Sequence, residues 1–217
     1  MLQLESFEMR LAVVVLASYL LGSIPTAYLI AKVNNFNIFE IGSGNMGATN
    51  ISRILGIKWG LVVWFLDSVK GCAAIMLARV VLVDQALATT ISAVFAIIGH
   101  NWSIIVQMLI GSLRGGKGAA TAFGTLLMVA PAQVIIIVFA ISGAIVARTR
   151  YMSLGVLVMF GLSIGWIFVL IAQQQMDPVF IVYGVLLMAL LLYRFRENIR
   201  RIFDGTERRL GEDAKTA

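Results

Sequence analysis

The stretch MSLGVLVMFGLSIGWIFVLIA, residues 152–172, runs for 21 residues without a charged side chain. An α-helix needs about 20 apolar residues to cross the hydrocarbon core, and backbone groups inside lipid must bond within their own segment. We therefore expect a membrane-spanning helix here. Four further runs have a similar character, at residues 11–31, 59–78, 86–108 and 178–193.

The composition agrees with several membrane spans. Of 217 residues, 60% are hydrophobic and 13% charged, whereas a soluble domain has about 25% charged residues. Cys72 is the only cysteine, so no internal disulfide can form, and we expect it to be a small buried hydrophobic residue. Glu5 and Glu8 replace the basic cluster of a signal peptide, so we expect the first run to remain as a membrane anchor.

The region 118–147 is too long for one crossing and has Pro131 near its middle, where proline removes a helix hydrogen bond. It is either one bent span or two short ones. Lys and Arg accumulate in cytoplasmic loops, so their distribution can decide between the two. With seven crossings and the N-terminus outside, 14 of the 17 basic residues are cytoplasmic, Arg10 and Arg79 lie outside, and Lys70 lies within the membrane.

With six crossings, Arg148, Arg150 and the basic tail would move outside, so the charge distribution favours seven. The sequence therefore predicts an all-α polytopic membrane protein with seven transmembrane helices, its N-terminus outside and its C-terminus cytoplasmic. Two short helices flanking Pro131 would tilt, re-enter or line a cavity. We expect one domain over residues 1–217, with cytoplasmic motif loops at about 33–58, 109–118, 148–153 and 194–217.

The first polar stretch, GSGNMGATNISR at residues 42–53, contains G-x-G-x-x-G, and Asp67 follows Gly47 by 20 residues. This pattern occurs in dinucleotide-binding folds, but Asp67 lies in an apolar span and no βαβ unit surrounds the glycines. Small residues that expose backbone N–H groups, together with hydroxyls and Arg53, favour anion binding instead. The alternative is a flexible loop without a ligand.

The second polar stretch, GSLRGGKG at residues 111–118, nearly matches a phosphate-binding Walker A loop. Gly118 stands where a Ser or Thr would bind magnesium, so nucleotide hydrolysis is not supported. Backbone amides before a helix plus Lys117 can still bind a phosphate without a metal. The alternative is a glycine hinge with interfacial charges.

Three ionisable residues lie deeper in the apolar segments. Asp67 and Lys70 share a helix face and can neutralise each other, so we expect a structural ion pair. His100 can hydrogen-bond a substrate or a neighbouring helix, and both options stay open. With one histidine and no cluster of acids or thiols, we expect no metal site. The net charge of +6 suits anionic lipid headgroups, and no nucleic-acid recognition motif is present.

Taken together, the chain resembles the PlsY family, the bacterial acyl-phosphate-dependent glycerol-3-phosphate acyltransferases, over nearly its whole length. The motifs that carry the resemblance are GSIPT at 22–26, IGSGNMGATN at 41–50, GH at 99–100, GGKG at 115–118 with AT at 120–121, RYMSL at 150–154, and ENI at 197–199 with Gly205 and Glu207.

The resemblance implies acyl transfer from acyl phosphate to the 1-hydroxyl of glycerol 3-phosphate, at the cytoplasmic face of the bacterial inner membrane. It implies no cofactor; acyl phosphate, glycerol 3-phosphate and membrane lipids would be the partners, and the oligomeric state stays open, with a monomer as one option. The expected catalytic residues are Ser43, Arg53, Lys117 and His100. The expected substrate-binding residues are Gly44, Asn45, Gly47, Thr49, Asn50, Gly115, Gly116, Gly118, Ser153, Asn198 and Glu207.

Two positions depart from the family pattern. Phe195 stands where the family has a histidine, which removes a possible phosphate donor, and Ser103 replaces a proline, which would loosen the local turn. The mechanism that we expect needs little acid–base equipment, because acyl phosphate is already activated: Arg53 and Lys117 neutralise the phosphates, and Ser43 and backbone amides orient the acyl carbonyl. A His-x4-Asp base is absent, because Ile105 follows His100 by five residues. The alternative function is a transporter or flippase for a phosphorylated metabolite or lipid.

Overall fold

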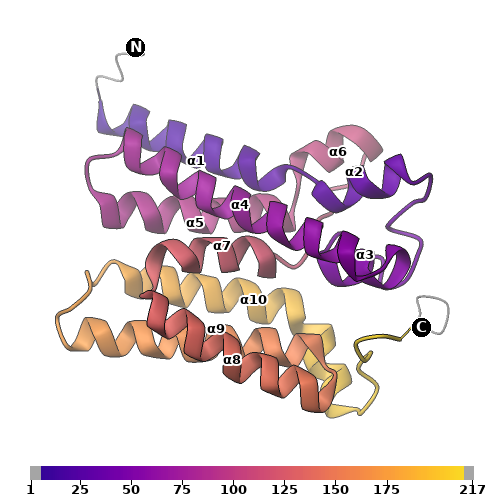
Figure 1. The fold of residues 1–217 in the computed structure, drawn as a ribbon. Helices are drawn as coiled ribbons and strands as arrows, with labels where there is room; N and C mark the ends of the chain where they lie inside the picture. The colour runs from indigo at the N-terminus through magenta and orange to yellow at the C-terminus, as the bar shows by residue number, and fades with distance from the viewer. Residues whose placement is uncertain (1–5, 213–217) are drawn as a thin grey trace.

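The structure, a computed structural model, describes residues 6–212, and all regular elements in that range are helices. Figure 1 shows α1, α4 and α5 lying side by side, with α7 between this group and a second group formed by α8, α9 and α10. The helices are α1 (Phe7–Ser23), α2 (Thr26–Val33), α3 (Ala48–Leu55), α4 (Ile57–Val81), α5 (Gln85–Asn101), α6 (Ile104–Ile110), α7 (Ala119–Val129), α8 (Ala132–Thr149), α9 (Met152–Ala172) and α10 (Phe180–Phe203). The prediction of an all-α fold is confirmed.

Five segments within residues 6–212 are long and apolar enough to cross a membrane. They are Phe7–Val33, Ile57–Val81, Gln85–Ile110, Ala132–Thr149 and Met152–Ala172. Large apolar side chains such as Leu16, Phe65 and Ile136 are more than half exposed on their outer faces, as lipid contact requires. Four of these segments coincide with predicted apolar runs, whereas the run at 178–193 belongs to α10, which continues into charged residues from Arg194 onward.

Two of the predicted runs are broken rather than continuous helices. The first breaks at Ile24 and Pro25, where the carbonyl of Ile24 accepts a hydrogen bond of 2.9 Å from Lys70 Nζ. The second breaks at Trp102 and Ser103. Ser103 caps α6 through Val106 N–H at 3.2 Å and donates to the carbonyl of Ser23 at 2.6 Å. Ser103 therefore holds this turn through hydrogen bonds, and the expectation that it loosens the turn is wrong.

Pro131 separates two distinct helices instead of bending one. α7 has 11 residues and ends at Val129, and Pro131 caps the start of α8, which has 18 residues. The prediction of two helices is confirmed, but only α7 is short. Proline has no N–H donor and its φ is fixed. It suits the start of a helix, because the N–H groups there have no partner within the helix.

α7 packs closely against α4 through glycines on both helices. A Cβ added to Gly124 would lie 1.9 Å from the carbonyl oxygen of Ser68, and one added to Gly71 would lie 2.3 Å from that of Thr121. Such distances are far below van der Waals contact, so both positions need glycine. This close approach places the start of α7, and the glycine-rich loop before it, against the centre of the first helix group.

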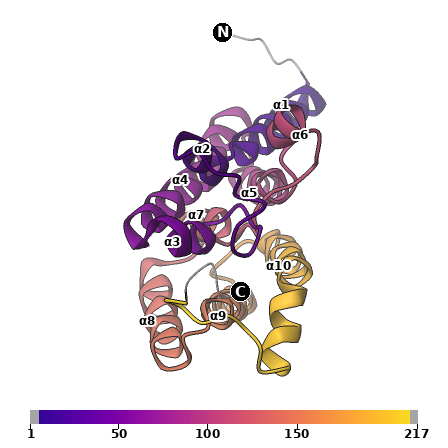
Figure 2. The same ribbon diagram turned by 90° about the vertical axis from the view of Figure 1, so that its right-hand side faces the viewer.

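The polar loops gather at one end of the bundle. In Figure 1 the helices α2, α3 and α6 and the C-terminal segment lie at the end opposite to the start of α1. Viewed from that end, the C-terminal segment passes beside α9 (Figure 2). The sequence-based prediction that the polar stretches lie on the same side of the bundle is therefore confirmed.

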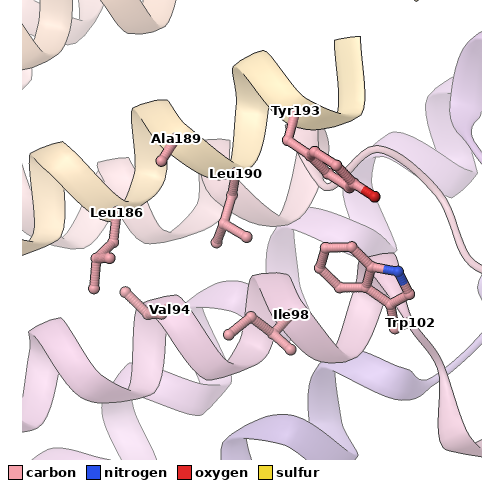
Figure 3. A pocket seen from close by; sticks show the side chains of 7 residues that line it. All are labelled: Val94, Ile98, Trp102, Leu186, Ala189, Leu190 and Tyr193. Carbon is pink, nitrogen blue, oxygen red and sulfur yellow. The ribbon is translucent and has the colours of Figure 1, made fainter. Parts of the chain in front are cut away.

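A shallow apolar groove of about 260 Å³ lies on the outer surface between α5 and α10 (Figure 3). Trp102 and Tyr193 line the end of the groove that lies nearest the polar loops, and their ring centroids are 6.0 Å apart. The Arg194 guanidinium lies over the Trp102 ring. Aromatic rings of this kind are typical of the interface between lipid and water.

Candidate active site

A cavity of about 600 Å³ lies where the two helix groups meet the polar loops. One part of its wall is polar and is contributed by several separate segments. Its residues include Ser43, Asn45, Gly47, Thr49, Asn50, Arg53, Asp67, His100, Lys117, Gly118, Ser153, Asn198, Arg201, Glu207 and Arg208. Another part is apolar and includes Trp64, Phe123, Phe139, Val156 and Met159.

Asn50 organises the first polar loop. Its side-chain oxygen accepts from the Ser43 N–H at 2.9 Å, and its Nδ2 donates to the carbonyls of Ile41 at 3.1 Å and Ile38 at 3.4 Å. The Asn50 side chain is buried, so it fixes the loop in place. Because the Ser43 N–H is already bonded, the polar group that Ser43 presents to the cavity is its hydroxyl rather than its backbone amide.

Arg53 reaches the cavity from α3, an amphipathic helix of eight residues. Its Nε is buried without a hydrogen-bond partner. Burial lowers the pKa of Arg53, and the nearby guanidinium of Arg208 lowers it further. A guanidinium that is partly desolvated and lacks a partner favours an anionic ligand.

The glycine-rich loop is held against the end of α5. The Gly116 N–H donates to the His100 carbonyl at 3.1 Å, while the Gly116 carbonyl accepts from Arg194 at 2.6 Å. A Cβ on Gly116 would lie 2.1 Å from His100 Nε2, and one on Gly115 would lie 2.1 Å from the His100 carbonyl oxygen. Gly115 and Gly116 thus set the path of the loop by close packing, and Lys117 and Gly118 line the cavity.

Lys117 lies between Asn198 and Phe195. Its Nζ donates to Asn198 Oδ1 and lies 5.0 Å from the centre of the Phe195 ring. Burial, followed by the charge of Arg201, lowers the pKa of Lys117 to about 8. Phe195 therefore contributes a cation–π contact to Lys117, which the sequence-based comparison with a histidine did not anticipate.

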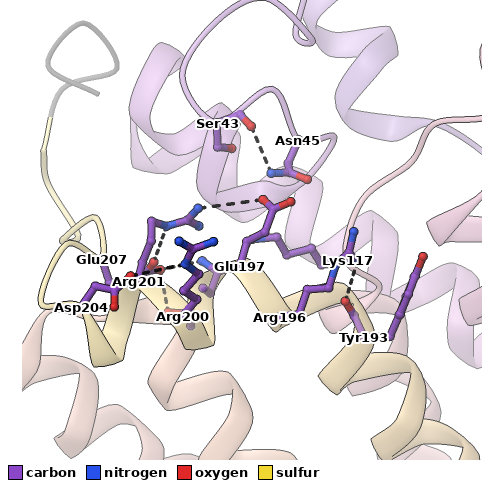
Figure 4. A network of polar contacts seen from close by, with 12 residues as sticks. Ser43, Asn45, Lys117, Tyr193, Arg196, Glu197, Arg200, Arg201, Asp204 and Glu207 are labelled. Atoms are coloured by element: carbon purple, nitrogen blue, oxygen red, sulfur yellow. Dashed lines mark hydrogen bonds and ion pairs between the residues drawn. The ribbon is translucent and has the colours of Figure 1, made fainter.

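Glu207 connects the tail, α9 and α10. It accepts hydrogen bonds from Ser153 Oγ at 2.7 Å and from Asn198 Nδ2 at 2.6 Å. It also accepts from Arg201 Nε at 2.9 Å, and Figure 4 shows Arg201 beside Glu207. Burial by itself would raise the pKa of Glu207, but these hydrogen bonds outweigh it and hold that pKa below its usual value. Glu207 thereby fixes Asn198, and Asn198 in turn fixes Lys117.

A buried polar cluster of Asp67, Lys70 and His100 borders the inner wall. Lys70 Nζ lies 2.8 Å from Asp67 Oδ1, as the spacing of the two residues predicts. The same oxygen lies 3.9 Å from His100 Nδ1, and all three side chains are buried. Asp67 and His100 both line the cavity. The contact between them joins α4 to α5 and could not be read from the sequence.

Sequence reasoning missed Arg201 and Arg208, which it counted only as part of the cytoplasmic basic tail. Arg201 lies three residues after Asn198 on α10, so helical spacing alone could have placed both on one face. Arg208 lies beyond the helix, where no periodicity indicates direction. Among residues 6–212, no group of three His, Cys, Asp or Glu side chains is arranged to hold a metal ion.

Comparisons with known proteins agree with this arrangement. A family model described as glycerol-3-phosphate acyltransferase matches residues 12–205. A glycerol-3-phosphate acyltransferase of Thermus thermophilus is 41% identical over 202 residues, which cover 92% of this chain and 95% of the relative. One of Clostridioides difficile is 35% identical over 205 residues, covering 92% and 95%.

A solved structure shares the fold over almost its full length. The crystal structure of PlsY (YgiH), described as an integral membrane glycerol 3-phosphate acyltransferase in its glycerol 3-phosphate form, is similar with a TM-score of 0.81 at 33% identity. The match covers 93% of this chain and 96% of that chain. Because sequence relatives and a structural neighbour agree over nearly the whole length, this chain belongs to the glycerol-3-phosphate acyltransferase family.

Proposed function

We propose that this integral membrane enzyme transfers a fatty acyl group from acyl phosphate to the 1-hydroxyl of glycerol 3-phosphate, giving lysophosphatidic acid and phosphate. The observation that carries the proposal is the two-part cavity, in which a cationic polar wall adjoins an apolar wall of aromatic and aliphatic side chains. Two phosphate-bearing substrates fit the first part, and a fatty acyl chain fits the second.

The proposed chemistry uses positioning more than acid–base catalysis. The 1-hydroxyl oxygen attacks the acyl carbonyl carbon, a new C–O ester bond forms, and the bond from that carbon to the phosphate oxygen breaks. The hydroxyl proton passes to an oxygen of the departing phosphate. Arg53 and Lys117 neutralise the phosphates, and the Ser43 hydroxyl orients the carbonyl. The His100 side chain packs against Gly116 and forms part of the inner wall of the cavity.

The remaining predicted residues divide by the contacts that they make. Thr49, Gly47 and Asn45 border the cavity beside Ser43, so they can contact substrate directly. Ser153, Asn198 and Glu207 bind one another and act by holding Lys117. The remaining members act on loop shape, because their backbones or side chains are engaged within the loops. These are Gly44, Asn50, Gly115, Gly116 and Gly118.

The same proposal includes the membrane arrangement. We infer that α1, α4, α5, α7, α8, α9 and α10 cross the bilayer, with the N-terminus outside and the polar end facing the cytoplasm of a bacterial inner membrane. The inference is supported by the basic residues, which concentrate in segments at the polar end of the bundle. Residues 1–217 would form one domain, and acyl phosphate, glycerol 3-phosphate and membrane lipids would be its partners.

A transporter or flippase is not favoured, because the family match is to acyltransferases and the polar wall lies at one end of the bundle rather than at its middle. To test the proposal, purified protein is incubated with palmitoyl phosphate and labelled glycerol 3-phosphate, and in parallel with palmitoyl-CoA. We expect lysophosphatidic acid from acyl phosphate only, and its loss in Ser43→Ala and Arg53→Ala. Ester formation from palmitoyl-CoA alone, or uptake of the labelled compound into vesicles without an ester product, would refute it.

A further inference from the structure

Two guanidinium groups line the cavity and make no hydrogen bond or ion pair with the side chains or backbone of residues 6–212. The buried Nε of Arg53 has no hydrogen-bond partner. Arg208 makes no hydrogen bond or ion pair with the residues in 6–212, although it is half-buried and lines the same cavity. The two arginines are close enough for Arg208 to lower the pKa of Arg53.

Two acids, Glu207 and Glu212, act on Arg53 through their charge, and both are already engaged. Glu212 accepts from the Arg209 N–H at 2.9 Å. Glu207 accepts from Arg201, Ser153 and Asn198, so its charge is shared among three donors. Two like charges that face one partly desolvated cavity repel each other unless an anion lies between them. A phosphate group has two negative charges near neutral pH and several acceptor oxygens, and it satisfies two guanidinium groups at once.

The backbone of the tail sets the direction of the Arg208 side chain. After α10 ends at Phe203, Gly205 takes a φ of +68° and the Thr206 N–H donates to the Arg201 carbonyl at 2.8 Å. The following residues become more exposed one after another: Glu207 is buried, Arg208 half-buried and Arg209 exposed. Glu207 and Arg208 both line the cavity, whereas Arg209 does not.

Arg150 ties this segment down. The Leu210 N–H donates to the Arg150 carbonyl at 2.7 Å, and the Arg150 side chain donates to the Leu210 carbonyl from Nη2 at 2.6 Å and from Nε at 3.1 Å. Both peptide groups of Leu210 are thus bonded to one residue between α8 and α9. With Glu207 fixed on one side and Leu210 on the other, Arg208 is held over the cavity.

We propose that Arg208 binds the phosphate group of a substrate opposite Arg53, and that Arg150 is a positioning residue that holds the tail so that Arg208 reaches it. The proposal rests on the proposed function and adds a phosphate-binding residue to it. The ligand is a phosphate monoester or an acyl phosphate, and both share the chemistry that two guanidinium groups recognise.

The first test compares Arg208→Gln with Arg209→Gln. Both variants remove one positive charge from the tail, but the Arg209 side chain is exposed and packs against the Tyr151 ring. We expect Arg208→Gln to raise KM about tenfold for one of the two substrates, because one charge-assisted contact is lost. A rise for glycerol 3-phosphate assigns the acceptor phosphate, and a rise for palmitoyl phosphate assigns the donor.

Arg209→Gln should keep both KM values within about twofold of those of the unmodified enzyme. Equal effects of the two variants would show a general charge effect and overturn the proposal. So would a fall in kcat with both KM values unchanged in Arg208→Gln. Arg208→Lys retains the charge but loses the guanidinium fork, and it should recover part of the lost affinity.

The second test addresses the positioning role. Arg150→Ala removes the two side-chain hydrogen bonds to the Leu210 carbonyl but keeps the backbone bond, so it should raise the same KM as Arg208→Gln. In the double variant, Arg150→Ala should add little, because the residue that it positions is already gone. Additive effects would contradict a role through Arg208.

Equilibrium binding separates this proposal from the proposed function. Thermal stabilisation of the detergent-solubilised protein by glycerol 3-phosphate and by inorganic phosphate is measured without turnover. If the enzyme makes no ester but Arg208→Gln still weakens anion stabilisation about tenfold in concentration, the acyl-transfer proposal fails and the phosphate site stands. If the ester forms and neither KM nor anion stabilisation changes in Arg208→Gln, the acyl-transfer proposal stands and the Arg208 phosphate site is refuted.

Discussion

Lys117 is held in the polar wall of the cavity by two neighbouring residues of α10. It contacts Asn198 and the Phe195 ring, while Glu207 orients Asn198 from the other side. Its lowered pKa follows from burial and from the charge of Arg201. A lysine whose pKa lies near 8 is mostly protonated at neutral pH but begins to lose its proton just above it, so its charge is sensitive to the medium and to a bound anion.

We predict that substrate affinity falls as the pH rises above about 8. Only the protonated ammonium attracts phosphate, and the free enzyme loses this proton near pH 8. Between pH 7 and pH 9.5, kcat/KM should therefore fall by up to about tenfold per pH unit above the pKa. Lys117→Arg keeps its charge throughout this range and should flatten the profile. An unchanged profile in Lys117→Arg would rule out Lys117 as its source.

At Glu207, shape and charge can be separated. Glu207→Gln keeps one acceptor oxygen for Ser153 and Asn198, whereas Glu207→Ala leaves three donors without a partner. We expect Glu207→Ala to lower kcat/KM by about 10- to 100-fold and Glu207→Gln by less than tenfold. The control is Asp204→Asn, because Asp204 pairs with Arg200 only at the exposed surface, where ion pairs contribute little. Equal losses in the Gln and Ala variants would show that charge alone matters.

Among the elements, α7 is the short helix on which the site depends. It has 11 residues, and its first turn begins directly after Lys117 and Gly118. Glycines bring it into backbone contact with α4, and Trp64 of α4 packs on Phe123 of α7 with ring centroids 5.1 Å apart. The position of Lys117 relative to Arg53 therefore depends on how closely two helices approach each other.

Gly124→Ala should destabilise the protein by about 1–3 kcal/mol, because its Cβ would overlap the Ser68 carbonyl oxygen and separate α4 from α7. Thermal unfolding in detergent measures this, and activity should fall in parallel. The matched control is Gly161→Ala on α9, where an added Cβ meets nothing within 4 Å. This variant should be neutral or slightly stabilising, because alanine favours helix. Equal melting temperatures for the two variants would contradict the packing argument.

At the scale of the whole molecule, the polar end gathers α3, the glycine-rich loop, the start of α9 and the tail around one cavity. The basic residues concentrated at this end predict that it faces the cytoplasm. The exposed loop between α4 and α5, which contains Val83, lies at the other end (Figure 1).

The predicted orientation can be tested by labelling single cysteines in a Cys72→Ala background. An impermeant maleimide applied to intact bacterial spheroplasts should label Val83→Cys, which lies at the end assigned to the outside. It should label Arg209→Cys only after the membrane is permeabilised. Labelling of Arg209→Cys in intact spheroplasts, with Val83→Cys protected, would invert the topology. Labelling of both would place the two ends on the same side.

The sequence by itself determined the all-helical class and the separate helices around Pro131. It also determined the ion pair of Asp67 with Lys70 and the common end of the polar stretches. These are local or one-dimensional properties: apolar length, a missing N–H group, a spacing of three residues, and the sum of charges along the chain. Each can be read without knowing which helices are neighbours.

Only the tertiary structure decided which atoms meet. It showed that Ser103 stabilises the break between α5 and α6, that Phe195 covers Lys117, and that the tail returns to Arg150 and places Arg208 at the cavity. These contacts join residues 60 to 81 positions apart in several cases, as between Arg150 and Leu210 or Lys117 and Asn198. Their partners are chosen by helix packing and by the burial of polar groups, which depend on the whole chain at once.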